Sequence, residues 1–80
     1  MNILVTGGSG FIGSNLIEFL LSKKNVDKVI NVDCLSYAGS GGNNKEYLDN
    51  PNYFFEQVDV RSTGEIIDIF ARFNIDIVFL

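Results

Sequence analysis

A glycine-rich turn follows directly on an apolar run at the start of the chain. Residues 3–13 read ILVTGGSGFIG, with glycine at positions 7, 8, 10 and 13. Each glycine costs backbone entropy on folding, so this density indicates a tight turn or a close approach to another group. Residues 2–6, before the turn, suit a buried strand, and the residues from Phe11 to about Lys24 have helical spacing. We therefore predict a strand, a tight turn and a helix.

The glycine spacing narrows the function of that turn. It fits both Gly7-x-x-Gly10-x-x-Gly13 and Gly8-x-Gly10-x-x-Gly13, patterns typical of a turn that holds a dinucleotide pyrophosphate at a helix N-terminus. A tight packing turn is the alternative. The Gly-Lys-Ser/Thr ending of a nucleoside-triphosphate loop is missing, which disfavours ATP chemistry.

An aspartate closes the next predicted strand, KVINVD at residues 28–33. Asp33 follows Gly13 by 20 residues, the spacing at which a carboxylate can accept from both adenosine-ribose hydroxyls. That charge would repel the 2′-phosphate of NADP, and Cys34 rather than a cation follows it, so the sequence favours NAD. A strand-end turn residue is the alternative for Asp33.

Strands and helices alternate through the rest of the chain. The expected elements are a loop with one helical turn near 45–48, a strand at 53–58, a helix that begins at a Ser62-x-x-Glu65 capping box, and a strand at 76–80. Four strands with two or three helices predict an α/β fold, the N-terminal portion of a Rossmann-type doubly wound parallel sheet.

Asp59 follows the third predicted strand much as Asp33 closes the second. Carboxyl ends of parallel strands form the ligand crevice of such sheets, so the Asp59 carboxylate could accept from an adenine amino group or serve only as a turn residue. Tyr37, Tyr47 and Tyr53 are expected to pack or lie on the surface. Cys34 is expected to be a small, semi-buried hydrophobe, because the chain has no histidine to activate it.

Composition excludes several classes of protein. The chain has 80 residues, enough for one small domain, and a net charge of −4 with a pI near 4.4, which argues against nucleic acid or anionic membrane as a partner. One cysteine and no histidine leave no disulfide within the chain and none of the usual zinc sites. No signal peptide or transmembrane segment is expected, and a cytoplasmic protein is predicted.

Two segments carry a family resemblance: TGGSGFIG at 6–13 and DCLSYAG at 33–39. The first resembles the extended short-chain dehydrogenase/reductase superfamily. The second, together with FEQVDVR at 55–61, is most similar to the dTDP-glucose 4,6-dehydratase family within it. Ser40 and the Gly41-Gly42 pair depart from that family's pattern.

The resemblance implies an NAD site and assigns residues to it. For the turn and pyrophosphate these are Gly7, Gly10, Phe11, Ile12 and Gly13. For the adenosine ribose they are Asp33, Leu35 and Ser36, with Ala38 and Gly39 near the phosphates. For the adenine they are Asp59 and Val60.

The implied reaction in a complete relative is oxidation of a nucleotide sugar at C4 by NAD, loss of water across C5 and C6, and return of the hydride to C6. The acid-base groups and the sugar-nucleotide domain of such an enzyme are not in this chain, so residues 1–80 would be the N-terminal part of its NAD-binding domain. A homodimer is implied for the complete protein. The alternatives are another NAD-dependent sugar-nucleotide epimerase or dehydratase, or a noncatalytic NAD-binding module of 80 residues.

Overall fold

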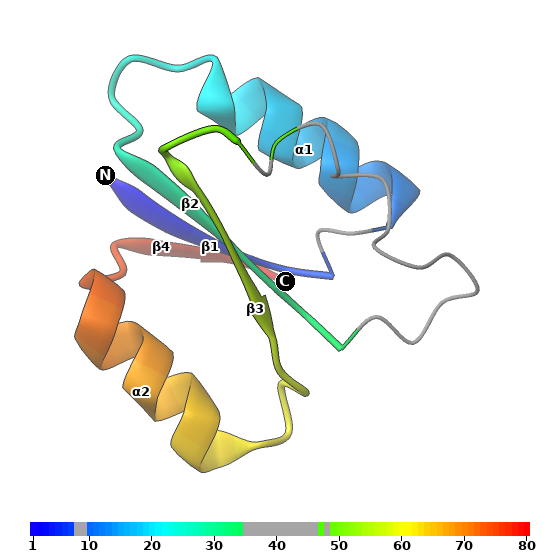
Figure 1. Cartoon of the computed structure of the whole chain (residues 1–80), viewed down its shortest axis with the longest axis vertical. Coiled ribbons are helices and arrows are strands. Elements are labelled where there is room, and N and C mark those ends of the chain that lie inside the picture. Colours follow the sequence, from blue (N-terminus) through cyan, green and yellow to red (C-terminus); the bar gives the residue numbers. More distant parts are fainter. Residues whose placement is uncertain (8–9, 35–46, 48) are drawn as a thin grey trace.

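The computed structural model describes residues 1–7, 10–34, 47 and 49–80 of the chain. Each of its two described helices lies between two strands in the sequence (Figure 1). The elements are β1 (Asn2–Thr6), α1 (Phe11–Leu21), β2 (Lys28–Asp33), β3 (Tyr53–Gln57), α2 (Thr63–Phe73) and β4 (Ile77–Phe79). The predicted helical turn near 45–48 falls almost entirely outside the described residues, within which Tyr47 belongs to a 3₁₀ turn.

All the strand pairs are parallel, and the order across the sheet is β3-β2-β1-β4. The register pairs Thr6 with Val32 and Asp33 with Gln57, so the carboxyl ends of β1, β2 and β3 lie side by side at the same end of the sheet. This order is that of the first half of a Rossmann sheet, in which the direction of winding reverses beside β1. The predicted fold class is confirmed.

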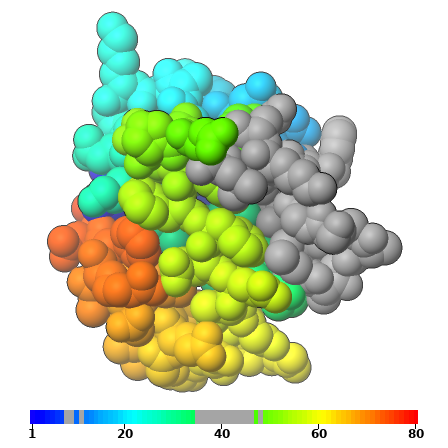
Figure 2. All heavy atoms as spheres, viewed as in Figure 1, coloured from blue at the N-terminus to red at the C-terminus, as the bar shows by residue number. Residues whose placement is uncertain are grey.

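The helices cover opposite faces of the sheet (Figure 1). Side chains alternate along the strands, so that Ile3 and Val5 pack with Ile17 of α1, whereas Leu4 and Ile30 pack with Ile69 of α2. In the space-filling view, β3 lies between the two helices along the viewed face (Figure 2). Two thin cores, one on each face, therefore stabilise the sheet.

The first helix ends earlier than its sequence predicts. It stops at Leu21, and Lys23 and Lys24 lie beyond it, so its last turn contains no basic residue. The Ser22 hydroxyl donates to the Phe19 carbonyl at 2.6 Å, and the N–H groups of Ser22 and Lys23 donate to the carbonyls of Phe19 and Leu20. Satisfying these carbonyls locally ends the helix before the lysines.

The capping box predicted at α2 does not form. Ser62 is the N-cap residue, but its side chain makes no capping hydrogen bond. Its ψ of 85° departs from the extended conformation, and its N–H donates to the Asp59 carbonyl at 2.8 Å in a tight turn. The turn holds Ser62 away from the conformation in which a serine hydroxyl reaches the third residue of a helix.

Neither described helix has the length and apolarity that crossing a membrane requires.

Candidate functional site

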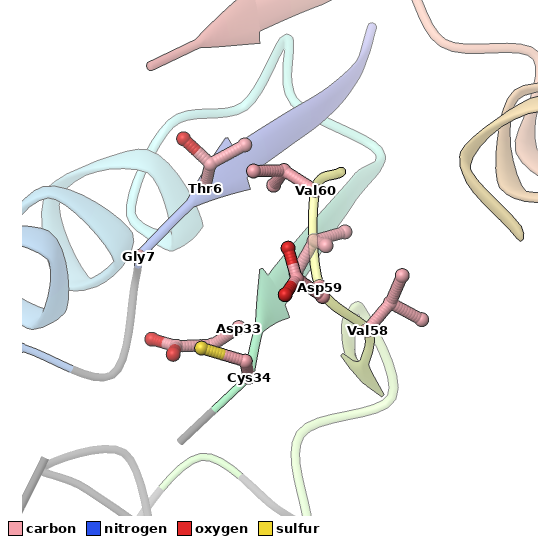
Figure 3. Close-up of a pocket in the computed structure, with 8 residues that line it drawn as sticks. Thr6, Gly7, Asp33, Cys34, Val58, Asp59 and Val60 are labelled. Carbon is pink, nitrogen blue, oxygen red and sulfur yellow. The ribbon is translucent and has the colours of Figure 1, made fainter. Parts of the chain in front are cut away.

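A hollow of about 230 Å³ lies at the carboxyl ends of β1, β2 and β3 (Figure 3). Its described lining consists of Thr6, Gly7, Val32, Asp33, Cys34, Val58, Asp59 and Val60. Pockets for whole ligands are usually about 300–1,000 Å³, so this hollow suits one part of a larger ligand, such as a nucleoside. Its position is where an open α/β sheet binds ligands.

Gly7 takes the chain out of β1 in a backbone conformation that favours glycine. Its φ is 68°, in the left-handed region. Its N–H donates to the Val32 carbonyl at 3.0 Å, and its carbonyl accepts from the Gly10 N–H at 3.2 Å. The turn is thereby fastened to both β2 and the start of α1, which confirms the tight turn predicted from the glycine spacing.

The start of α1 presents backbone N–H groups. Gly10 is an extended N-cap with φ of −77° and ψ of 176°, and its carbonyl accepts the first helical bond from the Ser14 N–H at 2.9 Å. The three N–H groups of residues 11–13 precede that bond and so have no partner within the helix. No acidic residue lies in the first turn. Such a helix start attracts anions.

Two other predicted residues of this turn, Ile12 and Gly13, lie in the first turn of α1. Ile12 leaves 83% of its surface exposed, as expected if it contributes its backbone rather than its side chain. Gly13 is half-buried inside α1. The Phe11 side chain is outside the described part of the structure, and so are Leu35, Ser36, Ala38 and Gly39.

Asp33 ends β2 with only 4% of its surface exposed, at the wall of the hollow. Two residues earlier on the same face, the buried Asn31 donates through Nδ2 to the Tyr53 hydroxyl at 3.0 Å. Burial raises the pKa of Tyr53, which therefore stays neutral near neutral pH. Tyr47 packs near Tyr53 with ring centroids 6.1 Å apart. The prediction that Tyr47 and Tyr53 pack is confirmed, and Tyr37 lies outside the described residues.

Asp59 stands two residues beyond the end of β3 and is held by Arg61. The Asp59 carboxylate accepts from the Arg61 backbone N–H at 2.9 Å and from the guanidinium through Nη2 at 2.6 Å. These hydrogen bonds lower the pKa of Asp59 from 3.8 to about 2, so the side chain is ionised at neutral pH. The hollow is therefore lined by an ionised carboxylate just beyond the end of β3.

The structure brings together four of the predicted site residues, namely Gly7, Asp33, Asp59 and Val60, at the hollow. Sequence reasoning did not select Thr6, Val32 or Val58, which supply the rest of its described wall. The signal that could have identified these three residues is their position, because each lies at or just beyond the carboxyl end of a strand. Their apolar or small side chains carry no chemistry that would have marked them.

Cys34 is exposed and lines the hollow, so the expectation of a semi-buried cysteine is wrong. It is the first residue after β2, beyond the part of the strand that α1 and α2 cover. The helices that bury the strand residues therefore do not bury its side chain.

A sequence model of the NAD dependent epimerase/dehydratase family matches residues 3–80. The chain belongs to this family. Among its relatives, dTDP-glucose 4,6-dehydratase of Haemophilus influenzae is 47% identical over 78 residues, which is 98% of this chain and 23% of that protein. The family resemblance found in the sequence is confirmed.

Two solved structures of this kind resemble the model closely. The NAD complex of dTDP-glucose 4,6-dehydratase from Bacillus anthracis has a TM-score of 0.84 at 35% identity, covering 98% of this chain and 25% of that one. UDP-glucose 4-epimerase from Thermotoga maritima, with UDP-glucose, has a TM-score of 0.75 at 37% identity, covering 98% and 23%. The family is NAD-dependent, which confirms the predicted cofactor at the level of the family.

The chain spans about a quarter of the length of these relatives. The family and the fold follow from the likeness. The reaction of the complete protein is a matter for proposal.

Proposed function

We propose that residues 1–80 are the N-terminal part of the NAD-binding domain of a dTDP-glucose 4,6-dehydratase. The observation that carries the NAD site is the pairing of an anion-attracting helix start with two aspartates at the carboxyl ends of the strands, and the choice of reaction rests on the likeness to dTDP-glucose 4,6-dehydratases. Backbone N–H groups at the start of α1 would bind the pyrophosphate. Asp33 would accept hydrogen bonds from the adenosine ribose hydroxyls, and Asp59 would accept one from the adenine amino group.

The residues present fit NAD better than NADP. Among the described residues that line the hollow there is no Lys or Arg to accept a 2′-phosphate, whereas Asp33 and Asp59 both face that space. A third phosphate here would meet carboxylates. Leu35, Ser36, Ala38 and Gly39 belong to the proposed site by family resemblance.

When bound, NAD supplies a hydride acceptor that can later return the hydride. The part of the protein described here would orient that cofactor, while the catalytic acid and base would come from elsewhere in the complete protein. The proposed reaction converts dTDP-glucose to dTDP-4-keto-6-deoxyglucose and water. A nucleotide-sugar substrate, a homodimeric assembly and a cytoplasmic location belong to the same proposal.

The test uses the complete polypeptide that carries these residues, incubated with NAD and dTDP-glucose. We expect a product lighter than the substrate by one water, detected by mass spectrometry. Unchanged dTDP-glucose with enzyme that has bound NAD would contradict the choice of substrate.

A 4-epimerase is the second candidate, favoured by the likeness to the T. maritima structure. The same incubation with UDP-glucose distinguishes the two, because epimerisation gives UDP-galactose, an isomer that chromatography separates. Interconversion of these two sugars would establish the epimerase instead.

A further inference from the structure

The Asp59 carboxylate is tied to Arg61 by more donors than an ordinary surface ion pair. Arg61 Nε lies 3.1 Å from each Asp59 oxygen, Nη2 lies 2.6 Å from Oδ2, and the Arg61 backbone N–H lies 2.9 Å from Oδ1. The planar guanidinium thus contacts both oxygens, a geometry that a lysine cannot reproduce. The orientation of the Asp59 carboxylate is fixed from both its side-chain and its backbone neighbours.

The Asp59 side chain also faces the hollow. It is 37% exposed, against 88% for Arg61, and Asp59 lines the hollow together with its neighbours Val58 and Val60. In Figure 3 the Asp59 carboxylate and the Val60 side chain point from the end of β3 toward the ends of β1 and β2. Arg61 is not among the described residues that line the hollow, so the guanidinium supports the carboxylate without entering that wall.

The chemistry of the supported carboxylate indicates which ligand group it can meet. An ionised carboxylate only accepts hydrogen bonds, and three N–H groups of Arg61 direct four of them at its two oxygens, the Nε–H being shared between both. A ligand group that reaches this carboxylate from the hollow must therefore be a donor, such as an exocyclic amino group. A carbonyl at the same place would meet negative charge.

We infer that Arg61 is a positioning residue, which holds the Asp59 carboxylate so that it meets the amino group of adenine and disfavours a base with a carbonyl there. This inference rests on the proposed NAD site and adds to it the residue that sets the choice of base.

A purely structural role for the Arg61 side chain predicts something different. The bond from the Arg61 backbone N–H to Oδ1 closes the turn between β3 and α2, and any residue other than proline keeps it. The side-chain bonds lie on the surface, where ion pairs contribute little to folding stability. Truncating the Arg61 side chain should therefore leave the fold intact while it frees the Asp59 carboxylate to rotate.

The test compares dissociation constants of the complete polypeptide for NAD and for nicotinamide hypoxanthine dinucleotide, in which a carbonyl replaces the adenine amino group. We expect the wild type to prefer NAD by about tenfold or more, because only NAD makes a hydrogen bond to the charged Asp59 carboxylate at this position. Arg61→Ala should reduce that preference at least about threefold, and Arg61→Lys should restore only part of it.

Two further variants serve as controls. Arg72→Ala removes an arginine of α2 that pairs with Glu56 of β3 and Asp68 of α2 and does not line the hollow, so it should leave the preference unchanged. Asp59→Asn presents an amide that can donate to a carbonyl, and should reduce or invert the preference. Circular dichroism of each variant verifies the fold.

Each outcome decides something. If Arg61→Ala folds and retains the wild-type preference, or binds NAD more tightly than the wild type, Arg61 is not a positioning residue. If the wild type binds neither dinucleotide, the proposed NAD site itself is wrong. If Asp59→Asn leaves the preference unchanged, Asp59 does not contact the base, and the inference fails with it.

Discussion

Gly7 shows how strongly one residue can constrain this site. With φ at 68°, any residue with a Cβ would be strained there, so the chain turns from β1 toward α1 at a position that favours glycine. Asp33 and Asp59 act differently, through charge: one is nearly buried at the end of β2, and the other is supported by Arg61 beyond β3. In the proposed site the backbone would shape the turn, and these two carboxylates would select the ligand.

The ionisation of Asp59 gives a pH prediction. Because its folded pKa of about 2 lies below the usual 3.8, folding favours the charged form. The resulting stabilisation is complete well above pH 3.8 and is lost as the pH falls toward 2. We expect the free energy of unfolding, measured with urea between about pH 5 and pH 2, to decrease less steeply for Asp59→Asn than for the wild type.

Arg61→Ala should reduce the same pH dependence, because it removes the side-chain hydrogen bonds that lower the pKa of Asp59. A wild-type slope in both variants would show that this ion pair does not form in solution.

At the scale of elements, α2 shows which parts of a helix the sequence determines. Its apolar residues at helical spacing predict a face that packs on the sheet, and Ile69 is 1% exposed in the core below it. Phe70 belongs to the same apolar set but is 41% exposed, so helical spacing alone does not identify the buried positions. Ser62 caps the helix without using its side chain.

A matched pair of substitutions on α2 tests this packing. Ile69→Ala should decrease the free energy of unfolding by about 2–5 kcal/mol, because it removes a buried side chain and leaves a cavity. Ile67→Ala, at a position 63% exposed, should change it by less than about 0.5 kcal/mol. Urea unfolding of both variants measures the difference. Equal losses would mean that α2 does not pack through Ile69.

The sequence predicts these elements well because each has a local signal. Apolar runs mark β1 and β2, and both occupy the residues expected for them. The ends were predicted less well: α1 stops at Leu21, where the Ser22 hydroxyl bonds the Phe19 carbonyl, and β3 stops at Gln57 rather than at Val58. In the site, glycine and aspartate stand out by residue type. Arg61 does not stand out in this way, because its proposed positioning role depends on the side-chain rotamer that brings the guanidinium to Asp59.

At the scale of the whole molecule, the sheet has an exposed edge strand, β4, which is distinct from the hollow at the carboxyl ends of the other strands. Beyond β1, the edge strand β4 pairs with Ile3 to Val5 on one side only, and its residues Ile77, Val78 and Phe79 are 36–40% exposed. An exposed apolar edge strand is a template for pairing with another chain. The described lining of the carboxyl-end hollow comes from the ends of the other three strands.

We expect the 80-residue chain, prepared alone, to self-associate through β4. Sedimentation velocity should show species larger than 8.9 kDa, increasing with concentration. Val78→Lys, which places a charge on the edge, should reduce the association if circular dichroism shows the same fold. A wild-type chain that melts cooperatively as a monomer would contradict this expectation.

The central claim is that Asp33, at the carboxyl end of β2, binds the ribose of NAD. Calorimetric titration of the complete polypeptide with NAD and NADP, for the wild type and for Asp33→Asn, tests it most directly. We expect the wild type to prefer NAD, and the variant to bind NAD about tenfold or more weakly while losing much of its discrimination against NADP. A variant that binds both cofactors as the wild type does would show that the adenosine lies elsewhere.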